Sequence, residues 1–344
     1  MITRIAFIGF GVVGQGLAEI LYEQKTELKD QFGFEFEVVA IADKMKGSVY
    51  VEHGLDLQKL LDLVKSTGKI DDYPEGLKGW DSLQTITETN ANLIVEVSWT
   101  DINTGEPAIS HIKAAIGCHK HVVMTNKGPI ALAARELLSM AQTNGVELRF
   151  EGTVLSGTPA INLGINNLAS SKITKIAGIV NGTTNYILTE MEKGLSYEVA
   201  LKQAQDLGYA EADPTADVEG YDALGKIVIL TNVVMGENIT KDQVPCQGIT
   251  KITTQDIEEA KKEGKRWKLI AGAELKDGSV EVYVRPEKIP LTHPLAAVSG
   301  PINALTYTTK YLGDVTIVGP GAGREATGYA LLTDILDIHR KISR

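Results

Sequence analysis

Five short apolar runs in the first half of the chain restrict its fold more than any other feature. They predict β-strands at residues 4–8, 38–42, 93–97, 121–124 and 146–150. Amphipathic stretches lie between several of them, such as Val13, Leu17, Ile20 and Leu21 at positions i, i+4, i+7 and i+8, and these predict helices. Because strands that alternate with helices build a parallel sheet covered on both faces, we expect a doubly wound α/β domain.

The second half of the chain has a different texture, rich in glycine, threonine and asparagine. Strands are predicted at 173–180, 267–275 and 279–285, with helices between them. The turn LKDGSV joins the last two strands as an antiparallel hairpin. This half is therefore expected to form a mixed α+β domain.

The length of 344 residues favours two domains, because a single hydrophobic core of that size is uncommon. We expect the first domain over 1–150 and the second over 151–318. The tail, VTIVGPGAGREATGYALLTDILDIHR, predicts a strand, a glycine turn and a helix, and we expect 319–344 to pack back on the first domain. Residues 45–80 are interpreted as a loosely patterned insertion with one helix at 57–64.

The charge of the chain limits its partners. A formal net charge of −10 argues against nucleic acid and anionic membranes, which need a basic surface, and favours small molecules or proteins. No run of about 18 uncharged apolar residues predicts a membrane span. The N-terminal sequence predicts a strand rather than a signal peptide, so we expect a cytoplasmic protein. The two cysteines, Cys118 and Cys246, suit a reducing compartment and are interpreted as buried packing residues.

The segment FIGFGVVG places Gly9, Gly11 and Gly14 in G-x-G-x-x-G spacing between a predicted strand and a predicted helix. Such glycines permit a tight turn and a close approach of the backbone to a pyrophosphate, and the helix N-terminus attracts the anion. The context favours a Rossmann-type dinucleotide site, with Val12 and Val13 at the helix start, over a structural turn.

The end of the second predicted strand bears on which cofactor is bound. Asp43 ends the run VVAIAD, where an acid normally holds the adenosine ribose of NAD. Lys44 and Lys46 follow at once and could instead meet the 2′-phosphate of NADP, or could be solvated loop charges. The choice between NAD and NADP stays open at this point.

The turn TNKGP follows the strand predicted at 121–124. Ligands of open parallel sheets bind at the C-terminal ends of the strands, so Lys127 is expected to point to a ligand crevice. Pro129 marks the start of the next helix. A solvated turn lysine is the alternative.

The apolar helix DALGKIVILTNVV contains only two charges, Asp222 and Lys226, which lie four residues apart and therefore meet on one face. On a surface such a pair would stabilise the helix by roughly a few tenths of a kcal/mol. The apolar neighbours instead predict a buried or cleft-lining pair. Burial disfavours the ammonium and the carboxylate restores it, which suits a proton donor for carbonyl reduction.

Acids ahead of this helix offer ligands for an amino group on a substrate. Asp213 and Asp217 flank Pro214, so capping and turn chemistry is the alternative, and it is favoured for Asp213. His111 and Tyr186 stand in no recognisable constellation and are interpreted as structural.

Six motifs that cover most of the chain together resemble the homoserine dehydrogenase family. They are GFGVVG at 9–14, VEVSWTDINTGEPAISHIKAAI at 95–116, HVVMTNKGP at 121–129, EGTVLSGTPAI at 151–161, IVNGTTNYIL at 179–188 and LGYAEADPTADVEGYDALGK at 207–226. The last is the most specific, because many dehydrogenases share a glycine fingerprint. The resemblance implies NAD(P)-dependent interconversion of L-aspartate 4-semialdehyde and L-homoserine, on the branch leading to threonine and methionine.

The resemblance also implies roles for residues at the substrate. Lys226 would donate the proton to the aldehyde oxygen, and Lys127 would lie between nicotinamide and substrate as a second catalytic or positioning lysine. The implied substrate ligands are Glu211, Asp222 and the backbone of Gly208. The active site would lie in a cleft between the two domains.

Further implied ligands concern the cofactor and a cation. Ser98 and the backbone of Gly323 would contact the cofactor. Family members also place a structural sodium ion at the segment EGTVLSGTP. Its implied ligands are Glu151 and the main-chain oxygens of Val154, Ser156 and Thr158.

The family usually forms homodimers through the second domain, and many members carry an additional C-terminal regulatory domain of the ACT type. This chain ends with a helix near Ile338, so we expect the short form, without feedback through such a domain. Two rival functions remain: reduction of another small amino aldehyde, and dinucleotide sensing without catalysis. The presence of both lysines favours an enzyme.

Overall fold

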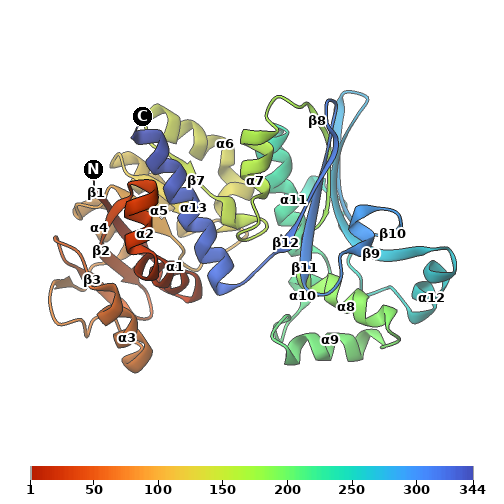
Figure 1. Ribbon diagram of the computed structural model, residues 1–344, viewed down its shortest axis with the longest axis horizontal. Helices are drawn as coiled ribbons and strands as arrows, with labels where there is room; N and C mark the ends of the chain where they lie inside the picture. The colour runs from red at the N-terminus through yellow and green to blue at the C-terminus, as the bar shows by residue number, and fades with distance from the viewer. Residues whose placement is uncertain (1, 344) are drawn as a thin grey trace. The chain divides into compact units, whose positions relative to one another are not determined.

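The structure is a computed structural model that describes residues 2–343 (Figure 1). The chain divides into two compact units. The first contains the residues up to Gly157 together with those from Gly323 onward, and the second is Thr158–Ala322. Within the described part of the chain, no helix is both long enough and apolar enough to cross a membrane.

The first unit is built on a seven-stranded sheet, sheet A, with the strand order β4-β3-β2-β1-β5-β6-β7. Its strands are β1 Ile2–Ile8, β2 Glu35–Asp43, β3 Gly47–Tyr50, β4 Leu77–Lys78, β5 Leu93–Glu96, β6 His121–Met124 and β7 Leu148–Arg149. The run from β2 through β1, β5 and β6 to β7 is parallel, whereas β3 and β4 extend the sheet antiparallel. The predicted α/β class is confirmed.

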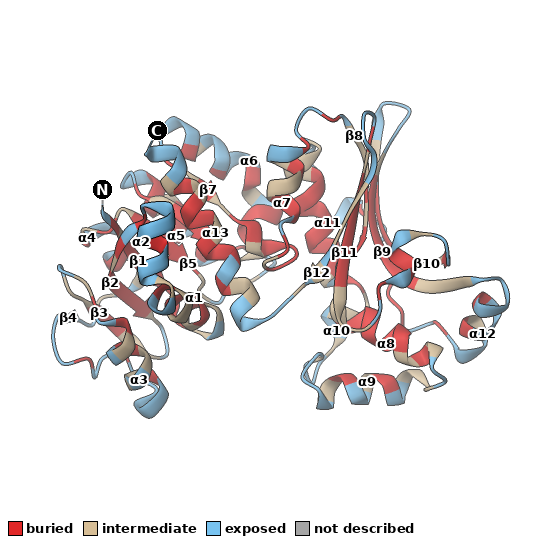
Figure 2. Ribbon diagram, in the orientation of Figure 1, coloured by how far each residue is buried: buried red, intermediate tan, exposed pale blue. Residues whose placement is uncertain are grey.

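Helices form two groups around sheet A: α1 contacts α3 and α13, whereas α5 contacts α4 and α6. Strands between two helical layers are buried on both faces, so residues 5–8 of β1 and 93–95 of β5 are uninterrupted buried apolar runs rather than alternating ones (Figure 2). The helices are α1 Val12–Glu23, α2 Lys25–Phe32, α3 Leu57–Thr67, α4 Ser82–Glu88, α5 Ala108–Gly117, α6 Lys127–Thr143, the short η1 Glu151–Thr153 and α13 Arg324–Ile342.

The segment 45–80 holds more structure than its sequence predicts. Helix α3 is present as expected, but β3 and β4 also form and attach the insertion to β2. These strands are four and two residues long, which is too short for a period-two pattern to be recognised. The predicted strand at 146–150 is also shorter than expected, because only the two residues of β7 pair with β6.

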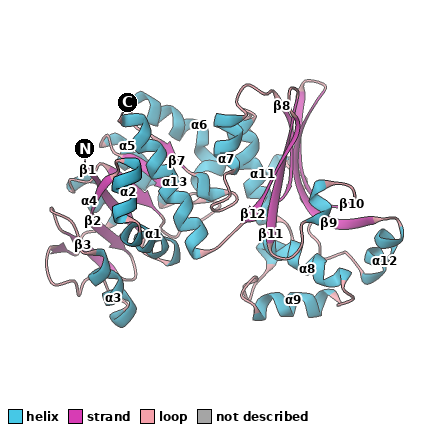
Figure 3. Ribbon diagram, viewed as in Figure 1, coloured by secondary structure: helices cyan, strands magenta, loops and turns pink. Residues whose placement is uncertain are grey.

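The second unit is built on a five-stranded antiparallel sheet, sheet B, with the order β10-β9-β8-β11-β12 (Figure 3). Its strands are β8 Ile173–Ile179, β9 Lys265–Lys276, β10 Ser279–Pro290, β11 Ile302–Thr309 and β12 Gly313–Pro320. The predicted hairpin between β9 and β10 is confirmed. The sequence analysis missed β11. The strand predicted at the start of the tail is β12, which forms the edge of sheet B in the second unit.

Helices α8 and α11 both contact β9. Helix α8 also contacts β11, and α11 also contacts β10. Side-chain caps fix where helices begin: Asn181, Ser196 and Thr253 each accept a hydrogen bond from a main-chain amide in the following turn. The helices are α7 Ala160–Asn162, η2 Leu163–Asn167, α8 Gly182–Glu192, α9 Tyr197–Asp206, α10 Thr215–Val218, α11 Tyr221–Val234, η3 Lys241–Gln243, α12 Thr254–Lys262 and η4 Pro294–Ala297.

The two cysteines are free thiols, and one of them differs from expectation. Cys246 is half-buried, but Cys118 is exposed, so its interpretation as a buried packing residue is wrong. Cys118 lies at the C-cap of α5, one residue beyond the helix whose apolar face is buried.

Helix α13 packs on α1 through a close approach of the two backbones. A Cβ added to Gly328 would lie 2.7 Å from the Leu17 amide nitrogen. One added to Gly16 would lie 2.6 Å from the Arg324 carbonyl oxygen. The absence of side chains at these two positions is therefore what allows α13 to dock.

Gly328→Ala is expected to lower the free energy of unfolding by about 1–3 kcal/mol, because the added methyl group meets main-chain atoms of α1. The matched control is Gly117→Ala in α5, where a Cβ meets nothing within 4 Å and stability should be unchanged or slightly higher. Urea unfolding followed by circular dichroism measures both variants. Equal stability of the two would contradict the packing argument.

Candidate active site

The glycine turn after β1 lies close to the ends of the neighbouring strands β2 and β5. Gly9 has a φ of +93° and donates its amide to the Ala42 carbonyl oxygen at 2.8 Å. A Cβ on Gly9 would lie 2.6 Å from the Ser98 amide nitrogen, just beyond β5. Both the backbone angle and the close approach therefore require glycine.

Of the two later glycines of the turn, Gly11 leaves room for a ligand and Gly14 is closely packed. A Cβ on Gly11 would meet no atom within 4 Å, whereas one on Gly14 would lie 3.0 Å from the Gly9 carbonyl oxygen. Gly11 is the N-cap of α1, and among the described residues no side chain caps this helix start. The first-turn amides, beginning at Val12 and Val13, are thus available to an anion.

A cavity of about 1030 Å³ lies beside the turn, within the first unit. Gly9, Gly11, Asp43 and Ser98 line it, as predicted for cofactor residues, and its size is at the upper end for small-molecule sites. The insertion supplies part of the wall through Trp80, which stacks on Tyr50 with 5.4 Å between ring centroids. The sequence analysis missed this wall. Of the other predicted cofactor residues, the cavity lining does not include Val12, Val13, Gly14, Lys127 or Gly323.

Asp43 joins the glycine turn to the turn that follows β2. Its Oδ2 accepts a hydrogen bond from the Phe10 amide at 2.7 Å, and its Oδ1 accepts from the amides of Met45 and Lys46 at 2.9 and 3.0 Å. The carboxylate is therefore held in place at the cavity wall. Lys44 and Lys46 also line the cavity.

A second polar group lies at the ends of β5 and β6. Glu96 has no exposed surface, and its carboxylate accepts from His111 Nδ1 at 3.0 Å, from Ser98 Oγ and from Asn126 Nδ2. Ser98 and His111 line the cavity. The hydrogen bond of His111 to the buried Glu96 agrees with its interpretation as structural. The partner itself was not predicted, because Glu96 lies 15 positions earlier and no local pattern links the two residues.

Lys127 is the first residue of α6 and is half-buried. The N-cap of this helix is Asn126, whose side chain makes no capping hydrogen bond, since it donates to Glu96 instead. Pro129 lies in the first turn of the helix, as expected.

The second unit contains the predicted lysine and carboxylate pair. Lys226 Nζ lies 2.8 Å from Asp222 Oδ2, and the two side chains are 8% and 16% exposed. Nζ also donates to the Val180 carbonyl oxygen at 2.6 Å. The pair is thus buried on α11 and oriented by a third group.

Asn181 extends this pair into a network. Its Nδ2 donates to Asp222 Oδ2 at 3.0 Å and to Asp217 Oδ1 at 2.6 Å, while its Oδ1 caps α8 by accepting from the Thr184 amide. Thr183 Oγ1 lies 3.2 Å from Asp217 Oδ2. Burial, and then the negative charge of Asp222, raises the pKa of Asp217 above its ordinary value. Asn181 and Thr183 were missed, although an N-cap pattern, NGTT, marks them in the sequence.

The residues ahead of α11 separate into two groups. Asp213 Oδ1 accepts from the amide and the hydroxyl of Thr215, which confirms the turn chemistry expected for Asp213. Asp217 belongs to the network instead. Glu211 is exposed, and Gly208, with a φ of +75°, follows the end of α9.

The segment after β7 is buried. Glu151, Val154 and Ser156 are each at most 3% exposed, and Ser156 has a φ of +53°. The Glu151 amide donates to Asp334 Oδ2 at 2.9 Å. Thr158, in the second unit, donates its hydroxyl to the Pro320 carbonyl oxygen. Gly323 is the N-cap of α13 with a φ of +134°, a conformation that essentially only glycine adopts.

The cavity, the glycine turn and Asp43 make the first unit a dinucleotide-binding domain, which places the chain among the NAD(P)-dependent oxidoreductases. Comparison with protein families is more specific. Residues 9–151 match the family model "Homoserine dehydrogenase, NAD binding domain", and residues 159–336 match "Homoserine dehydrogenase". The chain belongs to the homoserine dehydrogenase family.

Relatives cover the whole length of the chain. An NAD(+)-dependent homoserine dehydrogenase of Pseudomonas canavaninivorans is 44% identical over 99% of this chain and 97% of its own. A homoserine dehydrogenase of Methanocaldococcus jannaschii is 43% identical, with 99% of each chain covered. Among solved structures, a hyperthermophilic archaeal homoserine dehydrogenase mutant in complex with NADPH has a TM-score of 0.85 at 32% identity, covering 99% of this chain and 98% of that one.

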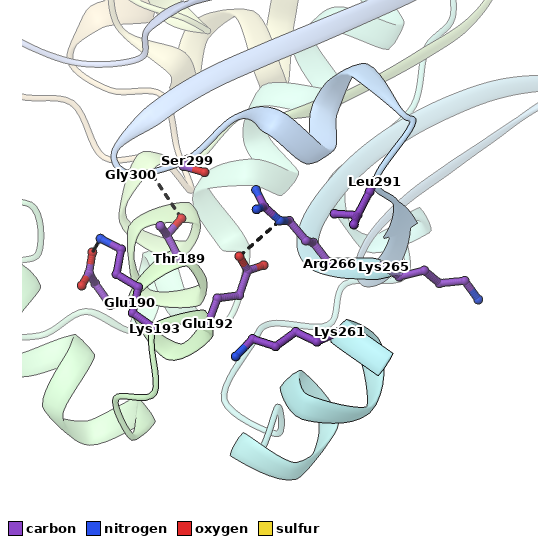
Figure 4. A pocket seen from close by; sticks show the side chains of 10 residues that line it. All are labelled: Thr189, Glu190, Glu192, Lys193, Lys261, Lys265, Arg266, Leu291, Ser299 and Gly300. Atoms are coloured by element: carbon purple, nitrogen blue, oxygen red, sulfur yellow. Dashed lines mark hydrogen bonds and ion pairs between the residues drawn. The ribbon is translucent and has the colours of Figure 1, made fainter. Parts of the chain in front are cut away.

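A second cavity, of about 540 Å³, lies in the second unit between the ends of α8 and α12 and the start of β9 (Figure 4). Two of its four cationic side chains pair with acids of the same lining. Arg266 Nε lies 3.4 Å from Glu192 Oε2, and Lys193 Nζ lies 2.7 Å from Glu190 Oε1. Lys261 and Lys265 also line the cavity, and their partners Glu258 and Glu263 lie outside the lining.

Lys268 lies near this second cavity, on β9, with no exposed surface. Its Nζ donates to Asn185 Oδ1 at 2.9 Å and to the Val298 carbonyl oxygen at 2.6 Å, both neutral acceptors. Burial lowers the pKa of Lys268 to about 8, and the charge of Glu192 offsets this only in part.

Lys268→Met is expected to change how stability depends on pH. The lysine has a pKa of about 8 when folded and 10.5 ordinarily, so the unchanged protein gains stability relative to the variant as pH rises between these values. The relative gain approaches about 3 kcal/mol. Chemical unfolding of both proteins below pH 8 and near pH 10.5 measures it. Parallel pH dependence of the two proteins would contradict the lowered pKa.

Proposed function

We propose that this protein catalyses the NAD(P)-dependent interconversion of L-aspartate 4-semialdehyde and L-homoserine, on the branch leading to threonine and methionine. The observation that carries the proposal is the buried pair of Lys226 and Asp222 in a chain of this family. Oxidoreductase chemistry on a carbonyl needs a proton donor at the oxygen, and a buried lysine beside a carboxylate suits this task.

Lys226 acts as the proton donor in the reducing direction. When bound, the nicotinamide supplies the hydride that reduces the aldehyde carbon. Lys226 gives its proton to the aldehyde oxygen, so negative charge on this oxygen never develops without a partner. In the oxidising direction Lys226 must first be neutral to take the hydroxyl proton, so oxidation is favoured at higher pH.

The acids around Lys226 hold the lysine and the substrate. Asp222 stabilises the ammonium of Lys226, and Asn181 keeps Asp222 oriented through its 3.0 Å hydrogen bond. Asp217 and the exposed Glu211 offer carboxylates to the ammonium end of the substrate. The backbone of Gly208 approaches the substrate, as the family resemblance implies.

Roles on the side of the cofactor follow from the family resemblance and from the end of sheet A. Ser98 and the glycine turn bind the cofactor, and Gly323 approaches it by its backbone. Lys127, at the start of α6, is a second positioning lysine between nicotinamide and substrate. It stands at the C-terminal end of β6, where ligands of open parallel sheets bind.

We infer a preference for NAD over NADP. The Asp43 carboxylate is fixed at the cavity wall by three amides, and its charge repels a 2′-phosphate while it can accept from a ribose hydroxyl. Lys44 and Lys46 line the same cavity and favour the phosphate, so the preference is moderate.

A sodium ion is compatible with the segment after β7. Glu151 and Asp334 are both buried, and Asp334 Oδ1 has no hydrogen-bond partner among the described residues. Burial, and then the charge of Glu151, raises the pKa of Asp334 well above its ordinary value. A cation held by Glu151 and by main-chain oxygens of Val154, Ser156 and Thr158, as the family resemblance implies, would reduce the repulsion between the two carboxyl groups. No three His, Cys, Asp or Glu side chains gather as metal ligands within residues 2–343, so main-chain oxygens would dominate, which suits a hard cation.

We also infer that the protein is a homodimer formed through the second unit, as the family resemblance implies. The edge strand β12 carries Val318, which is 56% exposed. A strand edge with an exposed apolar side chain needs cover, and a second copy of the chain can supply it.

Lys226→Ala is expected to lower kcat for reduction of aspartate semialdehyde by at least roughly 100-fold, the usual contribution of a general acid. The affinity for NADH should not change. Lys202→Ala is the matched control, since Lys202 also pairs with an aspartate four residues away, Asp206, but on an exposed surface. Loss of absorbance of the reduced cofactor measures turnover. Near-normal turnover of the Lys226 variant would defeat the assigned role.

Asp43→Asn is expected to shift the ratio of kcat/KM for NADH over NADPH toward NADPH by about tenfold, because a repelling charge is removed. Asp71→Asn is the control: Asp71 also accepts from a main-chain amide, that of Ser48 at 2.8 Å, but does not line the cavity. Steady-state kinetics with each cofactor measures the ratio. An unchanged ratio would mean that Asp43 does not select the cofactor.

A further inference from the structure

Glu96 is a buried carboxylate that makes hydrogen bonds with three side chains. It is the last residue of β5 and has no exposed surface. Ser98 and His111 donate to its Oε1, and Asn126 donates to its Oε2. These donors come from the loop after β5, from α5 and from the turn after β6. One carboxylate therefore ties together three segments that have no main-chain pairing in sheet A.

The position of this group in sheet A indicates which part of a dinucleotide it serves. In a fold of this type the cofactor spans the C-terminal edge with its pyrophosphate at the turn after β1. Asp43, at the end of β2, marks the adenosine side, and β5 lies on the opposite side of β1. Ser98 and His111 thus line the end of the cavity that receives the nicotinamide.

Asn126 connects Glu96 to the start of α6. An asparagine at an N-cap usually accepts a hydrogen bond from an amide in the first turn. Asn126 is the N-cap of α6 and makes no such bond, and its Nδ2 donates to Glu96. The turn that carries Lys127, the next residue, is thereby set by Glu96 rather than by its own helix.

The same carboxylate orients the ring of His111. An ionised carboxylate only accepts hydrogen bonds, so His111 Nδ1 carries the hydrogen in this contact. In the neutral ring, Nε2 then has a free lone pair and acts as an acceptor. The contact with Glu96 thus fixes the orientation of the ring at the cavity.

We propose that Glu96 is a positioning residue for the nicotinamide half of the cofactor. It holds Ser98 and His111 at the wall of the cavity and sets the turn of Asn126 and Lys127 beside it. The ligand class it serves is the nicotinamide riboside part of NAD(H), while the ADP-ribose part depends on the glycine turn and Asp43. This inference rests on the proposed function for the identity of the cofactor.

The test separates the two halves of the cofactor. Glu96→Gln keeps the shape of the side chain but replaces one acceptor oxygen with an NH₂ donor, which opposes one of the three donors. NADH binding, followed by its fluorescence, should weaken by about tenfold or more, the scale on which small misplacements act. Binding of ADP-ribose, which lacks nicotinamide, should not change. Glu147→Gln is the control, because Glu147 pairs with Arg149 elsewhere in the first unit and does not line the cavity.

His111→Phe provides an independent check, since it keeps a ring but removes the contact with Glu96, and it remains informative if the Glu96 variant does not fold. It should also weaken NADH binding while leaving ADP-ribose binding unchanged. Equal weakening of both ligands would show that Glu96 only supports the domain, and unchanged NADH binding in the folded variants would also overturn the proposal. Normal ligand binding by the unchanged protein without turnover of aspartate semialdehyde would defeat the proposed function and leave the role of Glu96 standing.

Discussion

Parallel pairing of β2, β1, β5 and β6 is the constraint on which the first unit depends, because it brings the C-terminal ends of four strands to one edge. Asp43 and Glu96 end two of these strands, and Gly9 and Asn126 lie just beyond the others. Hydrogen bonds then cross from strand to strand, from the Phe10 amide to Asp43 and from Asn126 to Glu96. Since a slip of one residue in strand register turns each side chain to the other face, the apolar core below this edge also fixes the polar groups along it.

The second unit contains two buried lysines that differ in their hydrogen-bond partners. Lys226 and Lys268 are both buried, and each donates to a main-chain carbonyl oxygen. Lys226 has Asp222 at 2.8 Å, whereas the hydrogen-bond acceptors of Lys268 are both neutral and its pKa falls to about 8. A buried ammonium loses its hydration, and only a nearby carboxylate compensates for that loss. Lys226 has such a carboxylate and is therefore the lysine suited to exchange a proton with a ligand.

Two asparagines connect helix starts to these charged groups in opposite ways. Asn181 caps α8 with its oxygen and still reaches Asp217 and Asp222 with its nitrogen, so folding of the helix and orientation of the acids depend on one side chain. Asn126 leaves α6 without a side-chain cap and donates to Glu96. Both residues lie in motifs that resemble the family, at 121–129 and 179–188. Neither was assigned a role from sequence, because a cap pattern predicts where a helix begins and not which distant group the side chain contacts.

The sequence by itself determined the class of the first unit, the glycine turn, the acid at the end of β2 and the ion pair on α11. All of these follow from periodicity or from spacings of a few residues, where backbone geometry alone decides which side chains meet. Only the tertiary structure decided three features: the short strands β3 and β4, the part of the cavity wall at Trp80, and the hydrogen-bond partners of Glu96. Their partners lie far apart in the chain, and only pairing in the sheet and burial in the core select one of the many contacts that the same residues could otherwise make.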